Sequence, residues 1–179
     1  TKTEPYVESD PRSPLGWYGT TKALAEEAVE KSGARYSIAR LSYPYRANFD
    51  QKPDLIKRIL AALSTHTLTP RFSDTLITPT LVDDIARGFA RLATLQPEGI
   101  YHLVGTGSIS PYDLAREVAI AYDLDPADVV ASSLAEYKKN HGGSFVKNGA
   151  MRNAMTKKVL GIEMVDLKTG LATIKAQQK

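Results

Sequence analysis

Apolar positions recur along the chain in two rhythms, one helical and one extended. The first helical stretch is predicted over residues 20–32, with Gly33 following as its C-cap. Its small and apolar face is formed by Leu24, Ala25, Ala28 and Val29. Residues 36–42 form a short, mostly apolar run without clean alternation, which is typical of a strand covered on both faces. Residues 1–17 are rich in proline and predict irregular connecting structure.

Two further helices are predicted in the middle of the chain. One spans residues 54–64, and its inward face is formed by Leu55, Ile56, Ile59, Leu60 and Leu63. The other begins near Asp83 and Asp84, because acids in the first turn interact favourably with the helix dipole. Its expected buried stripe is Ile85, Ala86, Phe89, Ala90 and Ala93. Between the two helices, prolines break residues 66–80 into short extended pieces.

The last part of the chain continues the alternation of strand and helix. Residues 100–104 form a predicted strand, and Ser110 is the expected N-cap of the next helix. Residues 138–149 are polar and Gly-rich, so they predict a loop. Two short helices are expected near residues 156–160 and 167–175. Because strands alternate with helices throughout, the sequence predicts an α/β fold.

Composition and charge narrow the class of protein. The 179 residues suit one domain, and 42% hydrophobic with 24% charged residues is a globular balance. A net charge of +3, with signs mixed along the chain, argues against a nucleic-acid binder. Since the chain has no cysteine, disulfides, thiolate metal sites and thiol nucleophiles are excluded. The three histidines are too scattered for a metal site, and no metal is expected.

The termini and the hydropathy give an expectation about location. No apolar run approaches the roughly 18 residues of a membrane span, and the polar first residues lack the apolar stretch of a signal peptide. We therefore expect a cytoplasmic protein with no membrane partner. The chain opens on Thr1 rather than Met. Removal of an initiator methionine and origin as a fragment of a longer chain both explain this, and both stay open.

A tyrosine and a lysine stand one helical turn apart near the start of the first predicted helix, in the run Tyr18-Gly-Thr-Thr-Lys22. An ammonium close to a phenol favours the phenolate, which prepares a tyrosine to exchange a proton with a carbonyl or alcohol oxygen. The lysine also has donors left to hold a cofactor ribose. We therefore treat Tyr18 and Lys22 as a candidate catalytic pair for reversible carbonyl reduction. The alternative is a packed tyrosine beside a solvated lysine.

Motifs in the same order along nearly the whole chain resemble those of extended short-chain dehydrogenases/reductases. Pro5-Tyr-Val-Glu-Ser-Asp10 and the Tyr18–Glu26 segment are similar to the P-Y-x-E-x-D and Y-G-x-T-K-x-x-G-E patterns of the dTDP-4-dehydrorhamnose reductase family, with Ala25 in place of its glycine. Further matches are Arg40-Leu-Ser42, Asn48-Phe49, Pro79-Thr80, Asp84-Ile-Ala86, Gly99-Ile-Tyr-His-Leu103 and the stretch from Arg152 to Gly161. Asn153 follows Arg152 where the family has proline.

The resemblance implies roles for individual residues. Tyr18 would donate a proton to the C4 carbonyl oxygen of a sugar, and Lys22 would hold the cofactor ribose. The chain would pass the nicotinamide at Ser42, Tyr43 and Pro44, so that Tyr18, Lys22 and these three form the cofactor-binding set. The implied substrate-binding residues are Trp17, Tyr45, Asn48, Phe49, Thr80 and Arg152. Whether Trp17 packs on the sugar or fills the core stays open.

The implied fold is the C-terminal part of a Rossmann-like extended short-chain enzyme with a small substrate-binding lobe. Residues 1–48 and 82–104 would be the remainder of the Rossmann-like domain that carries the Tyr–Lys pair, and residues 49–81 and 105–179 the lobe. The family's G-x-x-G-x-x-G turn, which binds the cofactor pyrophosphate, has no counterpart in the first 35 residues. The later run Gly105-Thr-Gly-Ser-Ile-Ser110 has Ser110 where the G-x-G-x-x-G pattern has its third glycine. It is therefore expected to be an ordinary turn.

The implied activity is NAD(P)-dependent reduction of a nucleotide-linked 4-keto-deoxysugar, of the dTDP-4-dehydrorhamnose reductase type, by an incomplete enzyme that is expected to be inactive alone. The implied cofactor is NADP or NAD. The expected partners are the nucleotide sugar and either a second copy in a homodimer or a missing N-terminal half. A nucleotide-sugar epimerase or dehydratase and a non-catalytic regulatory or scaffold member are the alternatives. His102 is expected to be a hydrogen-bonded core residue rather than a catalytic one.

Overall fold

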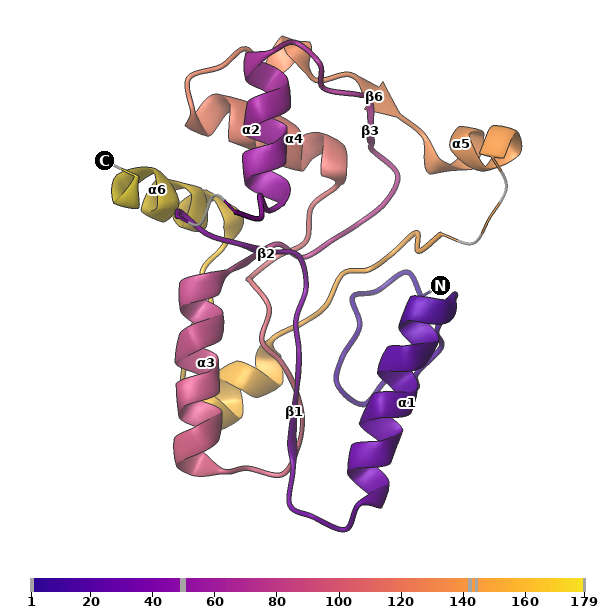
Figure 1. The fold of residues 1–179 in the computed structure, drawn as a ribbon, viewed down its shortest axis with the longest axis vertical. Coiled ribbons are helices and arrows are strands. Elements are labelled where there is room, and N and C mark those ends of the chain that lie inside the picture. The colour runs from indigo at the N-terminus through magenta and orange to yellow at the C-terminus, as the bar shows by residue number, and fades with distance from the viewer. Residues whose placement is uncertain (1, 49–50, 142, 144, 179) are drawn as a thin grey trace.

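The computed structural model describes residues 2–48, 51–141, 143 and 145–178. Its elements, drawn in Figure 1, follow the alternation that the sequence predicts. In chain order they are α1 (Trp17–Lys31), β1 (Ser37–Arg40), β2 (Pro44–Tyr45), α2 (Leu55–Ser64), β3 (Arg71–Phe72), β4 (Thr80–Leu81), α3 (Val82–Leu95), β5 (Gly99–His102), α4 (Pro111–Ala121), η1 (Pro126–Asp128), β6 (Ala131–Ser132), α5 (Leu134–His141), the π-helical turn η2 (Thr156–Leu160) and α6 (Leu167–Gln177).

The strands form three short parallel pairs: β1 with β5, β2 with β4 and β3 with β6. In the first pair Ser37 lies opposite Gly99, and Arg40 lies opposite His102. Figure 1 shows α1 and α3 flanking β1, with α2 and α4 together at the opposite end of the molecule and α5 apart from them. Parallel pairing with helical crossovers confirms the α/β class.

Two hydrophobic clusters hold these elements together. The larger one joins α2, α4 and α6 around Tyr45, and its fully buried members include Ile56, Ile59, Leu114, Val118, Leu171 and Ile174. The smaller one lies between α3, β5 and η2 and consists of Leu92, Tyr101, Leu103, Leu160 and Met164. The inward face predicted for α2 is confirmed, since Ile56, Ile59 and Leu63 are buried and Leu55 and Leu60 pack against them. The division into a Rossmann-like part and a lobe stays a prediction.

Helix α1 turns its apolar face outward. None of its residues is buried, and Leu24 and Val29 are exposed. The side that faces the rest of the molecule carries Glu26 and Glu30, which pair with Arg12. The amphipathic helix predicted from the sequence is therefore present, but the described residues provide nothing that covers its apolar face.

Helix α3 buries a different face from the one predicted. Its buried residues are Asp84, Ile85, Gly88 and Leu92, whereas Phe89 is about half exposed. Gly88 lies against Leu103, and a Cβ there would come within 2.8 Å of both Leu103 methyl carbons. The predicted stripe through Ala86, Phe89, Ala90 and Ala93 was wrong because it followed apolar side chains, while the contact is centred on a glycine.

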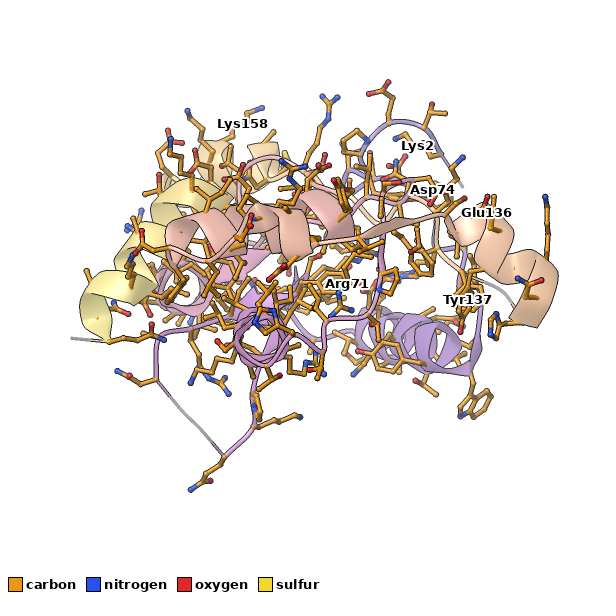
Figure 2. The ribbon with its side chains drawn as sticks, turned by 90° about the horizontal axis from the view of Figure 1, so that it is seen from above. Lys2, Arg71, Asp74, Glu136, Tyr137 and Lys158 are labelled. Carbon is orange, nitrogen blue, oxygen red and sulfur yellow. The ribbon has the colours of Figure 1, made fainter. Side chains whose placement is uncertain are left out.

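Helix α5 occupies part of the segment predicted as a loop. Its first amide, Leu134 N, donates to Asp74 Oδ1 at 2.7 Å, and Ser133 Oγ donates to Asp74 Oδ2 at 2.9 Å. The ring of Tyr137 packs edge-on against Phe72, with centroids 5.5 Å apart, and Figure 2 labels Asp74 and Tyr137 in this region. The loop prediction was wrong for residues 138–141, because the groups that begin and anchor the helix lie far away in sequence.

Within the described part of the chain, no helix combines the length and the hydropathy that crossing a membrane requires. The same residues contain no group of three or more His, Cys, Asp or Glu side chains arranged to hold a metal ion.

Candidate active site

The two residues of the candidate catalytic pair lie side by side on the first turns of α1. Lys22 Nζ is 5.4 Å from the centroid of the Tyr18 ring, within the range of a cation–π contact. The Tyr18 side chain is not packed away, since the residue is 76% exposed. Tyr18 is therefore not packed within the described part of this chain, and its catalytic role stays a prediction.

A pocket of about 410 Å³ lies beside Lys22, and Tyr18 is not among the residues that line it. Lys22 lines it together with Gly19, Ala23 and Glu26 of the same helix, so this face of α1 forms one wall. The opposite walls come from the segment before α1, from the ends of β1 and β5, and from residues 146–151. These walls include Tyr6, Val7, Asp10, Arg12, Arg40, His102, Asn148 and Met151. Charged groups at the wall next to Lys22 give the pocket a polar end.

Glu26 is held between two arginines at that polar end. Arg40 donates from Nε to Oε1 at 2.8 Å and from Nη2 to Oε2 at 2.7 Å, while Arg12 donates from Nε to Oε2 at 2.6 Å. Bidentate pairs of this kind are the stronger ion pairs in proteins. The hydrogen bonds from Arg40, and then those from Arg12, lower the pKa of Glu26 to about 2. Glu26 is therefore a carboxylate at any ordinary pH, and it ties α1 to β1 and to the segment before the helix.

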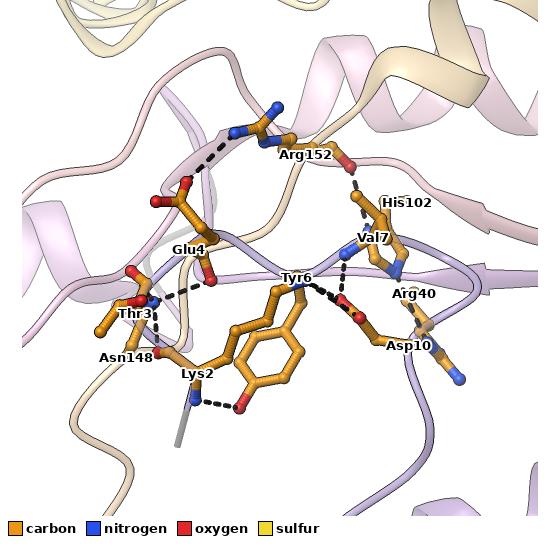
Figure 3. Close-up of polar contacts among 10 residues, drawn as sticks. All are labelled: Lys2, Thr3, Glu4, Tyr6, Val7, Asp10, Arg40, His102, Asn148 and Arg152. Atoms are coloured by element: carbon orange, nitrogen blue, oxygen red, sulfur yellow. Dashed lines mark hydrogen bonds and ion pairs between the residues drawn. The ribbon is translucent and has the colours of Figure 1, made fainter.

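His102 lines the pocket and is fully buried. Its Nδ1 is 3.0 Å from the carbonyl oxygen of Arg152, and its Nε2 is 3.5 Å from Arg40 Nη1 (Figure 3). Its backbone amide donates to Glu8 Oε1 at 3.2 Å. Burial lowers the pKa of His102, so the ring is neutral near pH 7. The prediction of a hydrogen-bonded core histidine is confirmed.

The segment before α1 is fastened to the far wall of the pocket through Asn148. The Asn148 side-chain amide donates to the carbonyl oxygens of Lys2, Thr3 and Glu4 at 2.9–3.1 Å (Figure 3). Tyr6 forms a parallel bridge with Met151. These contacts close the wall without a helix or an extended sheet.

Ser42, Tyr43 and Pro44, the residues predicted to pass the nicotinamide, come just after β1. Ser42 is buried, and its carbonyl oxygen accepts from Thr80 Oγ1 at 2.8 Å. Tyr43 has φ 41°, a left-handed conformation that turns the chain sharply, and both Tyr43 and Pro44 are exposed. In open parallel sheets, ligands bind beyond the carboxyl ends of the strands, which is where these residues lie.

The residues with predicted substrate roles are scattered. Tyr45 and Thr80 are fully buried, and Thr80 Oγ1 also accepts from Gly105 N at 3.1 Å. Asn48 is exposed, and Phe49 lies outside the described residues. Burial raises the pKa of Tyr45, so its hydroxyl stays protonated. These placements favour packing roles for Tyr45 and Thr80.

Trp17 and Arg152 both lie at the surface. Trp17 is 79% exposed, so it does not fill the core, and its contact with a sugar stays a prediction. The Arg152 guanidinium is 3.4 Å from the Glu4 carboxylate, and both side chains are more than half exposed. Asn153, which stands in place of the family's proline, donates from Nδ2 to Val104 O at 3.0 Å. A diphosphate contact by Arg152 stays a prediction.

The sequence alone missed the arginine–glutamate cluster and the contacts of His102 with Glu8 and Arg40. Glu26 and Arg40 belong to motifs recognised in the sequence, but nothing in their spacing indicates that they pair. The run at Gly105 behaves as the predicted turn, because Thr106 N donates to Val165 O at 3.0 Å and a Cβ on Gly105 would come 2.3 Å from Pro79 O. The backbone of this run is packed against and hydrogen-bonded to other parts of the protein.

Comparison with known protein families gives one match that runs the whole length of the chain. The model of the RmlD substrate binding domain covers residues 1–179. The chain belongs to this family. The resemblance found in the motifs is thereby confirmed.

Its relatives are longer proteins. SpsK, a spore coat polysaccharide biosynthesis protein of Bacillus subtilis (strain 168), is 30% identical over 138 residues, which are 75% of this chain and 46% of SpsK. A dTDP-4-dehydrorhamnose reductase of Burkholderia thailandensis is 26% identical over 180 residues, which are 93% of this chain and 59% of that protein. The chain thus spans about half the length of these curated relatives.

Solved structures show the same fold. A crystal structure of a dTDP-4-dehydrorhamnose reductase from Clostridium acetobutylicum superposes with a TM-score of 0.85 at 25% identity, over 99% of this chain and 61% of that one. A dTDP-4-dehydrorhamnose reductase from Bacillus anthracis, in complex with NADP, gives 0.84 at 21% identity over 98% and 60%. The fold is therefore that of part of a Rossmann-like extended short-chain enzyme.

Proposed function

We propose that this chain is the substrate-binding part of an NAD(P)-dependent reductase that acts on a nucleotide-linked 4-keto-deoxysugar, of the dTDP-4-dehydrorhamnose reductase type. One observation carries the proposal. Within a chain that matches the RmlD substrate binding domain from end to end, the exposed Tyr18 lies next to Lys22 on one helix, and Lys22 lines a pocket. Relatives from Sinorhizobium fredii and Burkholderia thailandensis are among those named dTDP-4-dehydrorhamnose reductase.

The chain's own residues supply acid–base chemistry and binding. Tyr18 gives its phenolic proton to the C4 oxygen of the sugar as that carbon is reduced, and the Lys22 ammonium stabilises the phenolate left behind. Trp17, Asn48 and Arg152 are the exposed members of the predicted substrate set, and they remain the candidates for contact with the nucleotide sugar. Tyr45 and Thr80 support the fold beneath it.

The residues present fit one end of a nicotinamide cofactor. Lys22 offers donors for ribose hydroxyls, and Tyr43 and Pro44 form an exposed turn beyond the carboxyl end of β1. The chemistry that a bound reduced nicotinamide supplies is the hydride. The first 35 residues contain no Gly-rich turn for the pyrophosphate.

A second α/β unit is the partner that fits this arrangement. The apolar face of α1 is exposed, and among the described residues β1 pairs with β5 alone. A strand and a helix added there would extend the sheet and cover Leu24 and Val29, and such a unit would also bring the missing pyrophosphate cradle. A second copy of the chain is the alternative occupant of the helix face.

The test is turnover of a dTDP-4-keto-6-deoxysugar with NADPH by the full-length gene product. We expect Tyr18→Phe to lower kcat by about 100-fold or more, because a positioned general acid contributes about that much. Lys22→Ala should lower kcat and weaken cofactor binding as well. Tyr112→Phe is the matched control, since that hydroxyl contacts only Arg116 on α4 within the described structure, and it should leave kcat unchanged.

Full turnover by Tyr18→Phe contradicts the proposal. Deuterium-labelled NADPH separates the related activities, because a reductase leaves the label in the product and returns oxidised cofactor, whereas an epimerase or dehydratase gives a product without net consumption of cofactor. Binding of the nucleotide sugar with no turnover of any such substrate would favour the non-catalytic reading.

A further inference from the structure

The candidate acid–base pair is followed on its own helix by a carboxylate. Tyr18, Lys22 and Glu26 are spaced four residues apart, so their side chains follow one another along one side of α1. A lysine and a glutamate at this spacing on an exposed helix attract each other. An ion pair between Lys22 and Glu26 would neutralise the charge that the proposed chemistry places beside Tyr18.

The structure shows Glu26 turned to other partners. Its Oε1 accepts from Arg40 Nε, and its Oε2 accepts from both Arg40 Nη2 and Arg12 Nε. Within the described residues, Oε1 has no partner besides Arg40. Glu26 and Arg40 are both shielded, with side chains 16% and 20% exposed, so solvent weakens their attraction less than that of a surface pair.

Lys22, unlike Glu26, forms no ion pair among the described residues. Its Nζ lies over the Tyr18 ring. The two arginines therefore satisfy the one carboxylate within a helical turn of Lys22. The arrangement keeps the ammonium charge directed at the phenol.

We propose that Arg40 is a positioning residue, which holds the Glu26 carboxylate away from Lys22 so that the Lys22 charge acts on Tyr18. The proposal rests on the function proposed above. Arg40 lines the pocket, and its described hydrogen bonds go to Glu26 and His102 and not to Tyr18, so it would act on the phenol only through Glu26 and Lys22.

The charged surroundings of Glu26 are consistent with this task. Arg12 comes from the segment before α1, Arg40 from β1 and His102 from β5, while Lys22 and Glu30 lie on the helix itself and Asp10 lines the same pocket. Arg12 also pairs with Glu30. His102 is neutral near pH 7 because burial lowers its pKa, so Arg40 remains the cation that satisfies Oε1.

The test compares pH profiles of sugar reduction by the full-length gene product and its variants. In Arg40→Gln, Glu26 Oε1 is released and turns to Lys22, and the alkaline limb of kcat/KM should move up by about one pH unit. Arg40→Lys keeps a cation at Oε1 and should retain the parental profile. The double variant Arg40→Gln/Glu26→Gln has no carboxylate to release and should return the limb to its parental position.

A second readout needs neither cofactor nor turnover. The ring resonance of Tyr18, assigned from its disappearance in Tyr18→Phe, is followed against pH by NMR in the 179-residue chain, and its midpoint should move in the same direction in Arg40→Gln. Glu27→Gln is the matched control. It removes a carboxylate from the same helix that pairs with Lys31 instead, and it should move neither readout.

The outcomes separate the two proposals. If Arg40→Gln only slows the enzyme, without moving the limb or the resonance, and Glu26→Gln does not reverse the loss, then Arg40 is merely structural and the inference is overturned. If Arg40→Gln does not fold, Arg40→Met, which keeps the apolar stem and removes the charge, takes its place, and an unmoved Tyr18 resonance there overturns the inference too. Full turnover by Tyr18→Phe would instead remove the proposed function, and with it the basis for this role of Arg40.

Discussion

The role of a single side chain in this protein depends on one or two neighbouring residues. A tyrosine is well suited to contact a sugar, yet the hydroxyl of Tyr45 points into the core, toward Gly170 of α6. An ideal Cβ on Gly170 would lie 1.8 Å from the Tyr45 hydroxyl oxygen and 2.9 Å from its Cζ. Gly170 is buried, so the close approach of α6 to Tyr45 depends on the absence of a side chain there.

Gly170→Ala is expected to destabilise the chain by about 1–3 kcal/mol, the usual cost of overpacking a well-filled core. Urea denaturation measures the change in the free energy of unfolding. Tyr45→Phe in the same chain removes the closest atom, so the two changes together should cost less than their separate costs combined. Gly16→Ala is the control, since nothing lies within 4 Å of a Cβ at that position. A Gly170→Ala protein as stable as the parent would show that α6 can shift away from Tyr45.

Whole helices differ in how they are held. Helix α4 buries Leu114, Ala115, Val118 and Ala119, and the Ser110 hydroxyl caps it by accepting from Asp113 N at 3.0 Å. Helix α1 buries no residue and has no side-chain cap. Its ties to the rest are Pro14, which packs against Gly19, and the arginines that hold Glu26 and Glu30. A helix anchored mainly by ion pairs opens more easily than one anchored by packing.

Amide hydrogen exchange of the 179-residue chain should therefore show faster exchange across α1 than across α4. The rates are read by NMR or mass spectrometry at neutral pH, with α4 as the internal reference. Arg40→Gln should raise the α1 rates further and leave those of α4 unchanged. Equal protection of the two helices would contradict the view that α1 lacks a packed partner in this chain.

For the molecule as a whole, the Glu26 cluster links stability to pH. The folded chain lowers the pKa of Glu26 from 4.5 to about 2, so the unfolded state binds more protons between these values. Stability from this group is therefore present above about pH 4.5 and is lost as the pH falls toward 2. Asp10, whose pKa is lowered chiefly by its hydrogen bond to Lys2, contributes in the same direction.

Urea denaturation at several pH values tests this linkage. Glu26→Gln should be less stable than the parent at pH 6, and the difference should shrink steadily as the pH approaches 2. Glu136→Gln on α5 is the control, because that side chain is exposed and lies in no ion pair of the described residues, and its difference from the parent should stay flat. A gap between parent and Glu26→Gln that does not change with pH would mean that the ion pairs add no pH-dependent stability.

The amino-acid sequence was sufficient for every property that depends on near neighbours in the chain. The alternation of strand and helix, the buried face of α2, the Ser110 cap, the contact of Tyr18 with Lys22 and the family motifs all follow from spacings of a few residues. Such spacings act through local backbone geometry, which repeats wherever the pattern occurs.

Folding in three dimensions was needed wherever distant segments meet. The pairing of Glu26 with Arg40, the burial of Tyr45 against Gly170, the start of α5 at Asp74 and the outward apolar face of α1 join residues that no local pattern connects. The buried face of α3 differs from the prediction for the same reason. Gly88 is buried because Leu103 packs closely against it, and not because glycine is hydrophobic. Close packing depends on the shapes of both contacting surfaces, and these surfaces come from segments that are far apart in the sequence.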